Sequence, residues 1–374
     1  MAIADAAYPR QRNDKDMPIY AIAGCRKEVA CSFLFLDGEC MDTPRFLYKY
    51  MPLREEFFSN TMIRATPARG LNDPFEMQFN RVQVRDAVQA LAKYFNAGGN
   101  SCGEIDDEYV RGQMEALEGE FDNLGVISFT EDFDNPLMWA HYADEHRGMV
   151  VEFDMSKPLF AGSCVQGEAG ARMSRFGDRF PSSAFEFPEK VRYRREMPAF
   201  DRSEYADPDS SNEFHWRKFS RAILFTKAID WMYEKEWRSV VELCEADSIA
   251  SDDCIHIRGV CDGLDDVELT EPDVGRINVC FPIGFEMQDD VGDFGVRKEV
   301  HHLSANSDGP VIHLFRVDPA AISAIYFGRR ADERECLKVL KGNRHLDHVE
   351  RIFKMRVSNS EYRLTPEPHS KFWR

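Results

Sequence analysis

ISFTEDFDNPLMWAHYADEHRGMVVEFD, residues 127–154, carries a clear succession of secondary-structure signals. It predicts a strand, an acidic loop, a short helix and a second strand. Val126–Phe129 is a compact apolar run after a glycine, as in a buried strand. Asn135 can cap free backbone N–H groups and Pro136 fits the first helical position, so this pair favours a helix start. Met149–Phe153 again has the composition of a strand.

The short helix in this stretch is expected to end at a glycine and to carry an aromatic face. His146–Gly148 supplies two basic residues for the last turn and a glycine just past it. Trp139 and Tyr142 lie three residues apart, so their rings share a face. With His141 they form either a pocket wall beside the acidic loop or part of the core, with their polar tips satisfied.

The composition indicates a globular chain without a membrane span. With 374 residues, 43% hydrophobic, the chain can bury a substantial core in one large or two smaller domains. No run of about 18 apolar residues is present, and residues 1–17 lack the apolar centre of an export signal. The formal net charge of −18 argues against non-specific attraction to nucleic acid. The ten cysteines form no CxxC pair, so we expect reduced, mostly buried thiols in a cytoplasmic protein.

The remaining elements follow from the apolar spacing along the chain. Residues 18–36 fit two strands or a strand and a helix equally well, and the Gly/Ser/Pro-rich residues 161–188 predict a long loop. Strands are expected at 47–50, 190–194, 239–243, 311–317 and 322–327, and helices at 57–63 (running into a strand), 83–95, 110–121, 213–229 and 333–340.

Three places bring polar side chains to the ends of apolar strands, where binding pockets tend to form. They are Tyr48, Lys49 and Tyr50 with Asn72 and Asp73; Ser128, Thr130 and Glu131 with Trp139–Tyr142; and Glu234–Arg238.

The segment Glu234–Arg238 carries the clearest chemical pattern of the three. In a strand, Glu234, Glu236 and Arg238 would point to one face, and the two residues between them to the other. Two carboxylates on one face repel each other unless a cation offsets them. One carboxyl can then have a raised pKa while Arg238 holds the other ionised. The alternative is an exposed sheet face with a ladder of charges.

Other chemistries have less support in the sequence. The chain contains no G-x-S-x-G elbow, no G-x-G-x-x-G and no P-loop. His301, His302 and His313 have no partners at metal-binding spacing. One acidic set could supply oxygen ligands for magnesium but matches no calcium-loop pattern: Asp73, Glu76, Glu131, Asp132 and Asp134.

Several blocks, in this order, resemble the bacterial domain-of-unknown-function family 2971. The resemblance covers roughly Phe46–Leu340, which implies an N-terminal extension (1–45), a core domain (46–345) and a peripheral C-terminal tail (346–374). The family name carries no activity. The blocks are FLYKYMPL (46–53), LNDPFE (71–76), the stretch 127–154, KVRYRRE (190–196), TKAIDWMYEKEWR (226–238) and AISAIYFGRRA (321–331).

More distantly, the layout looks like the ADP-ribosyltransferase fold, an α+β fold with a split mixed or antiparallel sheet and flanking helices. Such enzymes bind NAD between three strand-borne motifs. The resemblance places Tyr48–Tyr50 at the first motif, Ser128–Thr130 with Tyr142 at the second, and Glu234–Glu236 at the last. The chain departs from the family at the first motif, where Lys49 stands in place of His or Arg. Arg64 or Arg238 could substitute for it.

This resemblance implies an NAD-consuming enzyme that needs no metal. Glu236 would stabilise the oxocarbenium-like ribose and Glu234 would position the acceptor. Tyr142 or Trp139 would stack on nicotinamide, and Ser128 or Thr130 would bond nearby. The acceptor stays open between a protein, a nucleic acid, a small molecule and water. The other residues expected to bind NAD are Tyr48, Lys49, Tyr50, Asn72, Asp73, His141 and Arg238.

Two alternatives belong to other functional classes. One is a metal-dependent nuclease or phosphodiesterase that uses Asp73, Glu76, Glu131 and Glu236. The other is a non-catalytic ligand-sensing or partner-binding module of a bacterial anti-phage defence system. Both enzymatic hypotheses require the three motifs to converge within side-chain reach, and the binding module does not.

Overall fold

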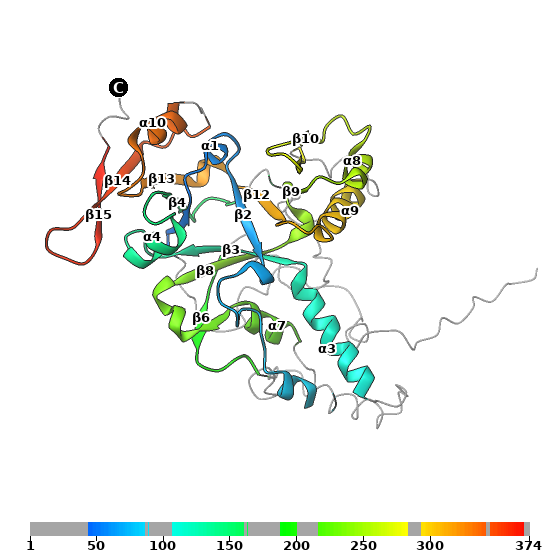
Figure 1. The fold of residues 1–374 in the computed structure, drawn as a ribbon. Coiled ribbons are helices and arrows are strands. Elements are labelled where there is room, and N and C mark those ends of the chain that lie inside the picture. Colours follow the sequence, from blue (N-terminus) through cyan, green and yellow to red (C-terminus); the bar gives the residue numbers. More distant parts are fainter. Residues whose placement is uncertain are drawn as a thin grey trace, which may run out of the picture. The chain divides into compact units, whose positions relative to one another are not determined.

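The computed structural model describes residues 44–86, 89, 107–160, 163, 188–199, 216–282, 293–341 and 345–369 (Figure 1). The elements expected at 18–36, most of the helix expected at 83–95 and most of the loop expected at 161–188 lie outside the described residues. Contacts divide the chain into two units, Met1–Asp42 with Asn80–Glu120 and Thr43–Phe79 with Phe121–Arg374.

Helix α3 (Asp107–Asp122) supplies most of what is described in the first unit. It follows the predicted amphipathic spacing and has acidic residues in its first turn, where negative charge is favourable. Arg85 pairs with Asp107 at 2.9 Å, and Arg81 pairs with Glu118 at 2.7 Å. Exposed ion pairs of this kind contribute little to stability.

The second unit is a mixed α+β structure built on one large sheet (Figure 1). Within this large sheet, the described strand pairs are antiparallel except for β13 with β14. Across the sheet the order is β10 (Glu268–Thr270), β11 (Arg276–Cys280), β9 (Ser248–Asp252), β12 (Ile312–Arg316), β2 (Met62–Pro67), β3 (Leu124–Thr130), β1 (Phe46–Met51), β4 (Met149–Asp154), β13 (Ile322–Phe327), β14 (Arg351–Val357) and β15 (Leu364–Pro368).

The central strand β3 has different neighbours on its two edges. Strand β8 (Glu236–Glu242) pairs with the whole length of β3 and also carries β5 (Glu189–Lys190). On the other edge, β2 pairs only at Val126 and Gly125, and β1 pairs only at Thr130. Between these points, no described strand covers that edge of β3 around Ser128. We call this opening the split.

Short helices lie beside the sheet (Figure 1). α8 packs on α9 near β9, and α1 contacts α10. Strands β6 (Arg192–Arg194) and β7 (Thr226–Ala228) form a separate parallel pair. The helices of the second unit are α1 (Glu55–Asn60), α4 (Pro136–Tyr142), α7 (Trp216–Leu224), α8 (Ile255–Cys261), α9 (Asp293–Ala305) and α10 (Glu333–Lys341), with 3-10 turns η3 (Ala68–Gly70), η6 (Ile229–Glu234), η7 (Leu243–Glu245) and η8 (Pro319–Ala321).

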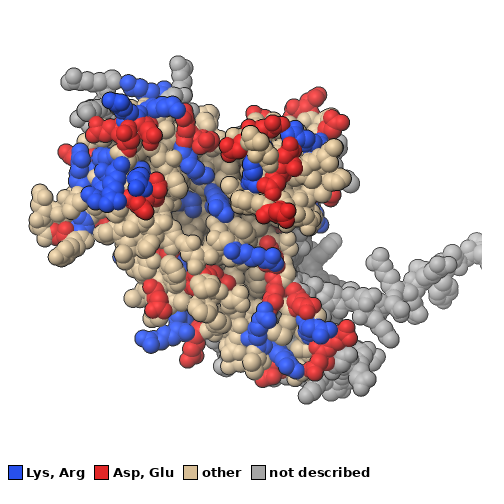
Figure 2. Space-filling view, in the orientation of Figure 1, with Lys and Arg blue, Asp and Glu red and all other residues tan. Residues whose placement is uncertain are grey.

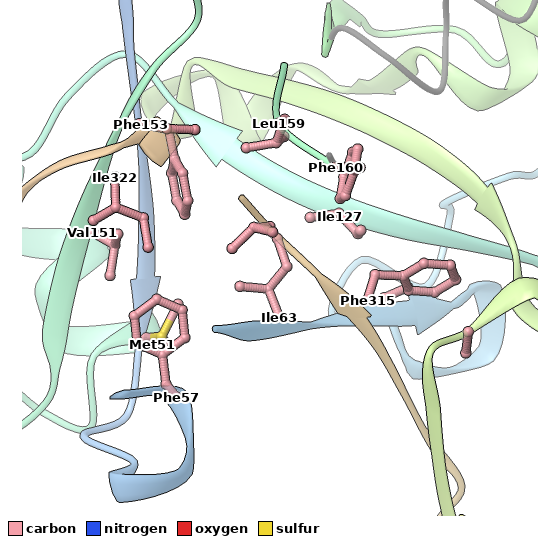
Figure 3. Packing of buried hydrophobic residues seen from close by; sticks show 14 of the residues in the cluster. Met51, Phe57, Ile63, Ile127, Val151, Phe153, Leu159, Phe160, Phe315 and Ile322 are labelled. Atoms are coloured by element: carbon pink, nitrogen blue, oxygen red, sulfur yellow. The ribbon is translucent and has the colours of Figure 1, made fainter. Parts of the chain in front are cut away.

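The alternation of β1 divides its side chains between two hydrophobic clusters. Leu47 and Met51 belong to the main core, whereas Tyr50 belongs to a second cluster. Figure 3 shows Met51 beside Phe57 of α1, with Ile63 of β2 in the same core. Burying one such side chain fully stabilises the fold by about 1.5–3 kcal/mol. Apolar side chains of β1, α1 and β2 therefore meet in this core.

Helix α4 begins as the sequence predicts but ends earlier. The Asn135 side chain accepts a hydrogen bond from the Leu137 N–H at 3.0 Å, and proline follows the cap. The predicted end at His146–Gly148 is wrong, because the helix stops at Tyr142. Residues 144–146 instead take left-handed backbone angles, with φ of 44°, 48° and 70°.

Tertiary contacts explain this left-handed turn. The His146 N–H donates to the Trp139 carbonyl at 3.0 Å, and the two rings lie nearly parallel, at 4°. Gly148 is needed for close approach, since a Cβ there would lie 2.3 Å from the Met51 carbonyl oxygen. A Cβ on Gly328 would lie 2.2 Å from the His146 carbonyl oxygen. Packing against distant strands thus overrides the local helix signal.

The segment after residue 345 extends the sheet. β14 runs parallel to β13, and β15 pairs with β14 through five residue pairs from Phe353–Pro368 to Val357–Leu364. The residues expected to form a peripheral tail therefore include the edge strand of the sheet. Within the described ranges, no helix combines the length and apolar content needed to span a membrane.

Candidate functional site

Five buried charged side chains gather beside β8. Arg238 has no exposed surface, and Glu236 is 3% exposed. We call this set the carboxylate network: Glu76, Lys227, Glu234, Glu236 and Arg238. Its members come from the loop after η3, from β7, from the end of η6 and from β8.

Arg238 uses its whole guanidinium group inside the network. Its Nε and Nη2 donate to the two carboxylate oxygens of Glu236, each at 2.9 Å. Nη2 also donates to Glu76 Oε1 at 2.6 Å, and Nη1 donates to the Leu224 carbonyl at 2.8 Å. Paired bonds to one carboxylate fix its orientation as well as its charge.

Lys227 is the second cation of the network. Its Nζ lies 2.6 Å from Glu234 Oε2 and 3.1 Å from both Glu236 Oε2 and Glu76 Oε1. The same ammonium lies 4.9 Å from the centroid of the Trp231 ring. Three carboxylates therefore share two cations, which leaves one negative charge in excess when all are ionised.

The two glutamates of the E-x-E sequence have opposite pKa shifts. Burial raises the pKa of Glu234, with a further contribution from Glu236, while Lys227 opposes the shift. Burial alone would also raise the pKa of Glu236, but Arg238 and Lys227 bring it down to about 2. This is the division predicted from the sequence, and it contradicts the alternative of an exposed ladder of charges.

The predicted strand geometry of this segment needs one correction. Glu234 is the last residue of η6 and does not lie on β8. Lys235, between the glutamates, has left-handed angles of φ 44° and ψ 50°. This turn lets both carboxylates reach Lys227. A non-glycine residue is uncommon in this region, so the surrounding contacts must hold Lys235 in it.

Tyr142 connects the network to the surface. Its hydroxyl donates a short hydrogen bond to Glu234 Oε1, and Asn72 also bonds to the Tyr142 side chain. Burial and Glu234 raise the pKa of Tyr142, so the phenol stays protonated. Asn135 holds the helix start in place by donating to the Tyr233 carbonyl at 2.9 Å. Tyr142 is only partly buried, so among the described contacts of Glu234 it is one that solvent reaches.

The second predicted motif also reaches the network. The Ser128 side chain hydrogen-bonds to Glu236, and Thr130 lies opposite Glu236 in the β3–β8 register. Thr130 is buried, and its Oγ1 accepts from the Asp132 N–H at 3.2 Å. Ser128 is partly exposed, so it is the member of this motif that a ligand can touch.

The first motif separates across the sheet. Lys49 Nζ donates to the Ser128 carbonyl at 3.1 Å, at the split. Burial lowers the pKa of Lys49 to about 8, and Glu236 works against this shift. Tyr48 instead lies near Glu152 and Phe133, and Tyr50 donates to the Asp132 carbonyl at 3.0 Å. Of the three, only Lys49 adjoins the network.

Other predicted residues have mainly structural contacts. Trp139 is fully buried, and its Nε1 donates to the Phe133 carbonyl at 2.7 Å, so its ring packs in the second cluster. Asp73 is buried and accepts from the Phe75 N–H at 2.9 Å. His141 is exposed beside Tyr142.

The acidic loop does not build a metal site. The Glu131 carboxylate accepts from Lys190 Nζ (2.7 Å) and from Trp237 Nε1 (2.8 Å), and alternation puts it on the sheet face opposite Glu236. Glu76 and Glu236 bind Lys227 and Arg238 instead of an ion. No three His, Cys, Asp or Glu side chains among the described residues are grouped to hold a metal.

Three contributors to this site have no catalytic or NAD-binding role in the prediction from the sequence. Glu76 is expected only as a metal ligand, and Lys227 and Tyr193 have no assigned role. The Glu236 N–H donates to the Tyr193 hydroxyl at 2.8 Å. One signal for Lys227 was present: two buried glutamates with a single arginine leave an uncompensated charge, which calls for a second cation nearby.

Comparison with protein families confirms the family resemblance. Residues 138–239 match the family described as "Protein of unknown function (DUF2971)". The matched segment contains Tyr142, Lys227, Glu234, Glu236 and Arg238, whereas Lys49 and Glu76 precede it. No match is found among curated proteins or solved structures.

Proposed function

We propose that this DUF2971 chain is an NAD-consuming enzyme of the ADP-ribosyltransferase type. The observation that carries the proposal is the junction of Tyr142, Glu234, Glu236 and Ser128 in one network beside the split. Distant parts of the sequence thus meet at two carboxylates with opposite pKa shifts. The α+β fold with an opening in its central sheet also agrees with the fold expected of an ADP-ribosyltransferase.

Transfer of ADP-ribose from NAD needs one carboxylate that stays ionised and one that can take up a proton. When the bond between ribose C1′ and the nicotinamide nitrogen breaks, its electron pair leaves with nicotinamide and the ribose becomes cationic. The excess negative charge of the network stabilises that cation, and Glu236 stays ionised at all ordinary pH values. As the acceptor bonds to C1′ it loses a proton. Glu234, with its raised pKa, takes that proton beside Tyr142.

Nicotinamide release from NAD tests the proposal directly. We expect the wild-type protein to release nicotinamide, with water or an added acceptor, and Glu236→Gln to lower the rate on the order of 100-fold. Glu131→Gln is the matched control, because Glu131 lies on the same region of the sheet but on the opposite face. Its rate should equal that of the wild type. A folded Glu236→Gln protein with full activity, or no release with protein, nucleic acid or small-molecule acceptors, would contradict the proposal.

A non-catalytic ligand-binding module is the second candidate. The near-complete burial of Glu234 and Glu236, at 4% and 3% exposed, favours it, because ion-paired buried groups also serve simply to hold a site in shape. Calorimetry with NAD separates the two functions. A non-catalytic module would bind NAD without releasing nicotinamide, and Glu236→Gln would then change only the affinity for NAD.

A further inference from the structure

Three cationic side chains lie on or next to the two strands that flank the split, and none of them is ion-paired with a described residue. Lys49 extends from β1, Arg54 precedes α1 and Arg64 lies on β2. After burial, Arg54 is the largest influence that lowers the pKa of Lys49, and Arg64 adds to it. Arg64 also lowers the pKa of Arg54. These three side chains, which we call the basic cluster, are thus close enough to repel one another.

The basic cluster lacks acidic partners. Within the described part of the chain, none of its members forms an ion pair, whereas Arg45 and Arg69 nearby pair with carboxylates. Lys49 bonds only to a main-chain carbonyl, and the Nε of Arg54 is buried without a hydrogen-bond partner. The acidic groups that act on them are Glu56 on Arg54 and Glu236 on Lys49, neither at ion-pair distance.

Concentrating unpaired cations in one place opposes folding unless something compensates for them. Desolvated charges are unfavourable without a partner, and this protein has 65 acidic residues from which to supply one. Figure 2 shows basic side chains gathered in a hollow of this face, over the region of β1 and β2. A cluster left unpaired in an acidic protein marks a place where an anion can bind.

The donors suit one class of anion. Two guanidinium groups offer planar pairs of N–H donors, and the lysine offers a compact charge. Together they match the several oxygens of a phosphate group better than the two oxygens of one carboxylate. We propose that Lys49, Arg54 and Arg64 bind a phosphate or diphosphate group of a ligand.

This site stands on its own geometry, and it deepens the proposed function if the bound group belongs to a nucleotide. Because the pKa of Lys49 is about 8, the ammonium is mainly protonated at neutral pH, and a bound anion would raise that pKa. The two possible sources, a free inorganic anion and a nucleotide, are distinguished by using pyrophosphate and ADP-ribose as separate probes.

Calorimetric titration of the full chain tests the site. We expect wild-type protein to bind pyrophosphate, Arg64→Gln to weaken binding about tenfold, and Arg64→Glu to abolish it. Arg69→Gln is the control, since Arg69 is exposed and pairs with Asp122 at 2.7 Å. Arg64 is exposed, so its variants should fold. ADP-ribose binding more tightly than pyrophosphate would identify a nucleotide ligand; the reverse order would identify a free anion.

The outcomes separate this site from the proposed enzyme. If pyrophosphate binds and is sensitive to Arg64 but NAD is never cleaved, the anion site holds and the enzymatic function fails. If NAD is cleaved but pyrophosphate does not bind, or binds equally well to wild type and Arg64→Gln, the function holds and the anion site is refuted.

Discussion

The carboxylate network and the basic cluster both contact Ser128, but the charges of the network are ion-paired and those of the basic cluster are not. In the network every carboxylate reaches a cation, and Arg238 has all three of its nitrogens engaged. In the basic cluster, no member forms an ion pair with a described residue. Each region keeps one buried atom without a hydrogen-bond partner, Glu76 Oε2 in the network and Arg54 Nε in the basic cluster. Paired buried charges hold a structure in one arrangement, whereas unpaired ones are available to a ligand. The comparison therefore separates what positions the site from what the site can bind.

The largest expected effect is on stability, from removing Arg238. Arg238→Met leaves Glu76 and Glu236 buried with one cation fewer, so we expect the free energy of unfolding to fall by about 3–5 kcal/mol. Arg64→Met should change it by less than about 0.5 kcal/mol, because Arg64 is exposed and unpaired. Urea unfolding at pH 7 measures both. Equal losses in the two variants would remove the distinction between the regions.

Removing Lys227 should cost nearly as much, and part of the loss should be recoverable. Lys227→Met leaves two excess negative charges, so we expect a loss of about 3 kcal/mol. Adding Glu234→Gln takes one carboxylate away and should restore about 1–2 kcal/mol. A double-mutant cycle in urea measures this coupling. Simple additivity of the two losses would mean that Lys227 and Glu234 do not share one network.

Acid should act first on a different region, the buried pair His301 and His313. The His301 Nδ1 and the His313 Nε2 lie 3.0 Å apart. Burial, with a smaller contribution from His302, lowers the pKa of His301 to about 4. Burial, with smaller contributions from His301 and Arg64, lowers the pKa of His313 to about 3. Both folded-state values lie below the ordinary value near 6.5, so the unfolded chain binds more protons. The contribution of this pair to the free energy of unfolding is complete above about pH 6.5 and is lost as the pH drops toward 4.

Glu236 should respond only at much lower pH. Its pKa of about 2 lies below the unfolded value near 4.3, so its contribution is complete above that value and is lost as the pH falls toward 2. Unfolding free energies at pH 7, 5 and 4 test this order. His313→Gln should flatten the slope between pH 6.5 and 4, and Glu236→Gln should leave it unchanged. The opposite pattern would assign the acid response to the network.

The smallest expected effect concerns the edge of the network. Tyr142→Phe removes one hydrogen bond to Glu234, with an expected loss of about 1 kcal/mol. The same change should raise the pKa of Glu234 further, because that bond favours the ionised carboxyl. NMR titration of the glutamate carboxyl signals measures the shift. A Glu234 pKa that does not move would mean that the phenol is not coupled to this carboxyl.

The comparison also shows what could be predicted from the sequence. Strand β1, strand β4 and the Asn135 cap follow from local spacing, and the structure contains all three. The opposite pKa shifts of Glu234 and Glu236 follow from their proximity and from Arg238 two residues further on. These are short-range patterns, and short-range physics determines them.

The parts that were wrong or missed depend on distant contacts. Glu76 and Arg238 are 162 residues apart, and no local pattern joins them. The end of α4 is fixed by packing against β1 and β13, and the turn at Lys235 by the demand of two carboxylates for one ammonium. These contacts exist only after the chain has folded, so no single segment of the sequence reveals them.

The two glycines beside α4 have a consequence for engineering the protein. The Gly328 N–H donates to the Gly148 carbonyl at 2.8 Å, with no room at either position for one added methyl group. Main chain, rather than adjustable side chains, therefore sets the spacing between this turn and the sheet. Directed evolution could change the exposed side chains of Asn72 and His141 next to Tyr142, but it could not shift Tyr142 relative to Glu234 without rebuilding the backbone itself.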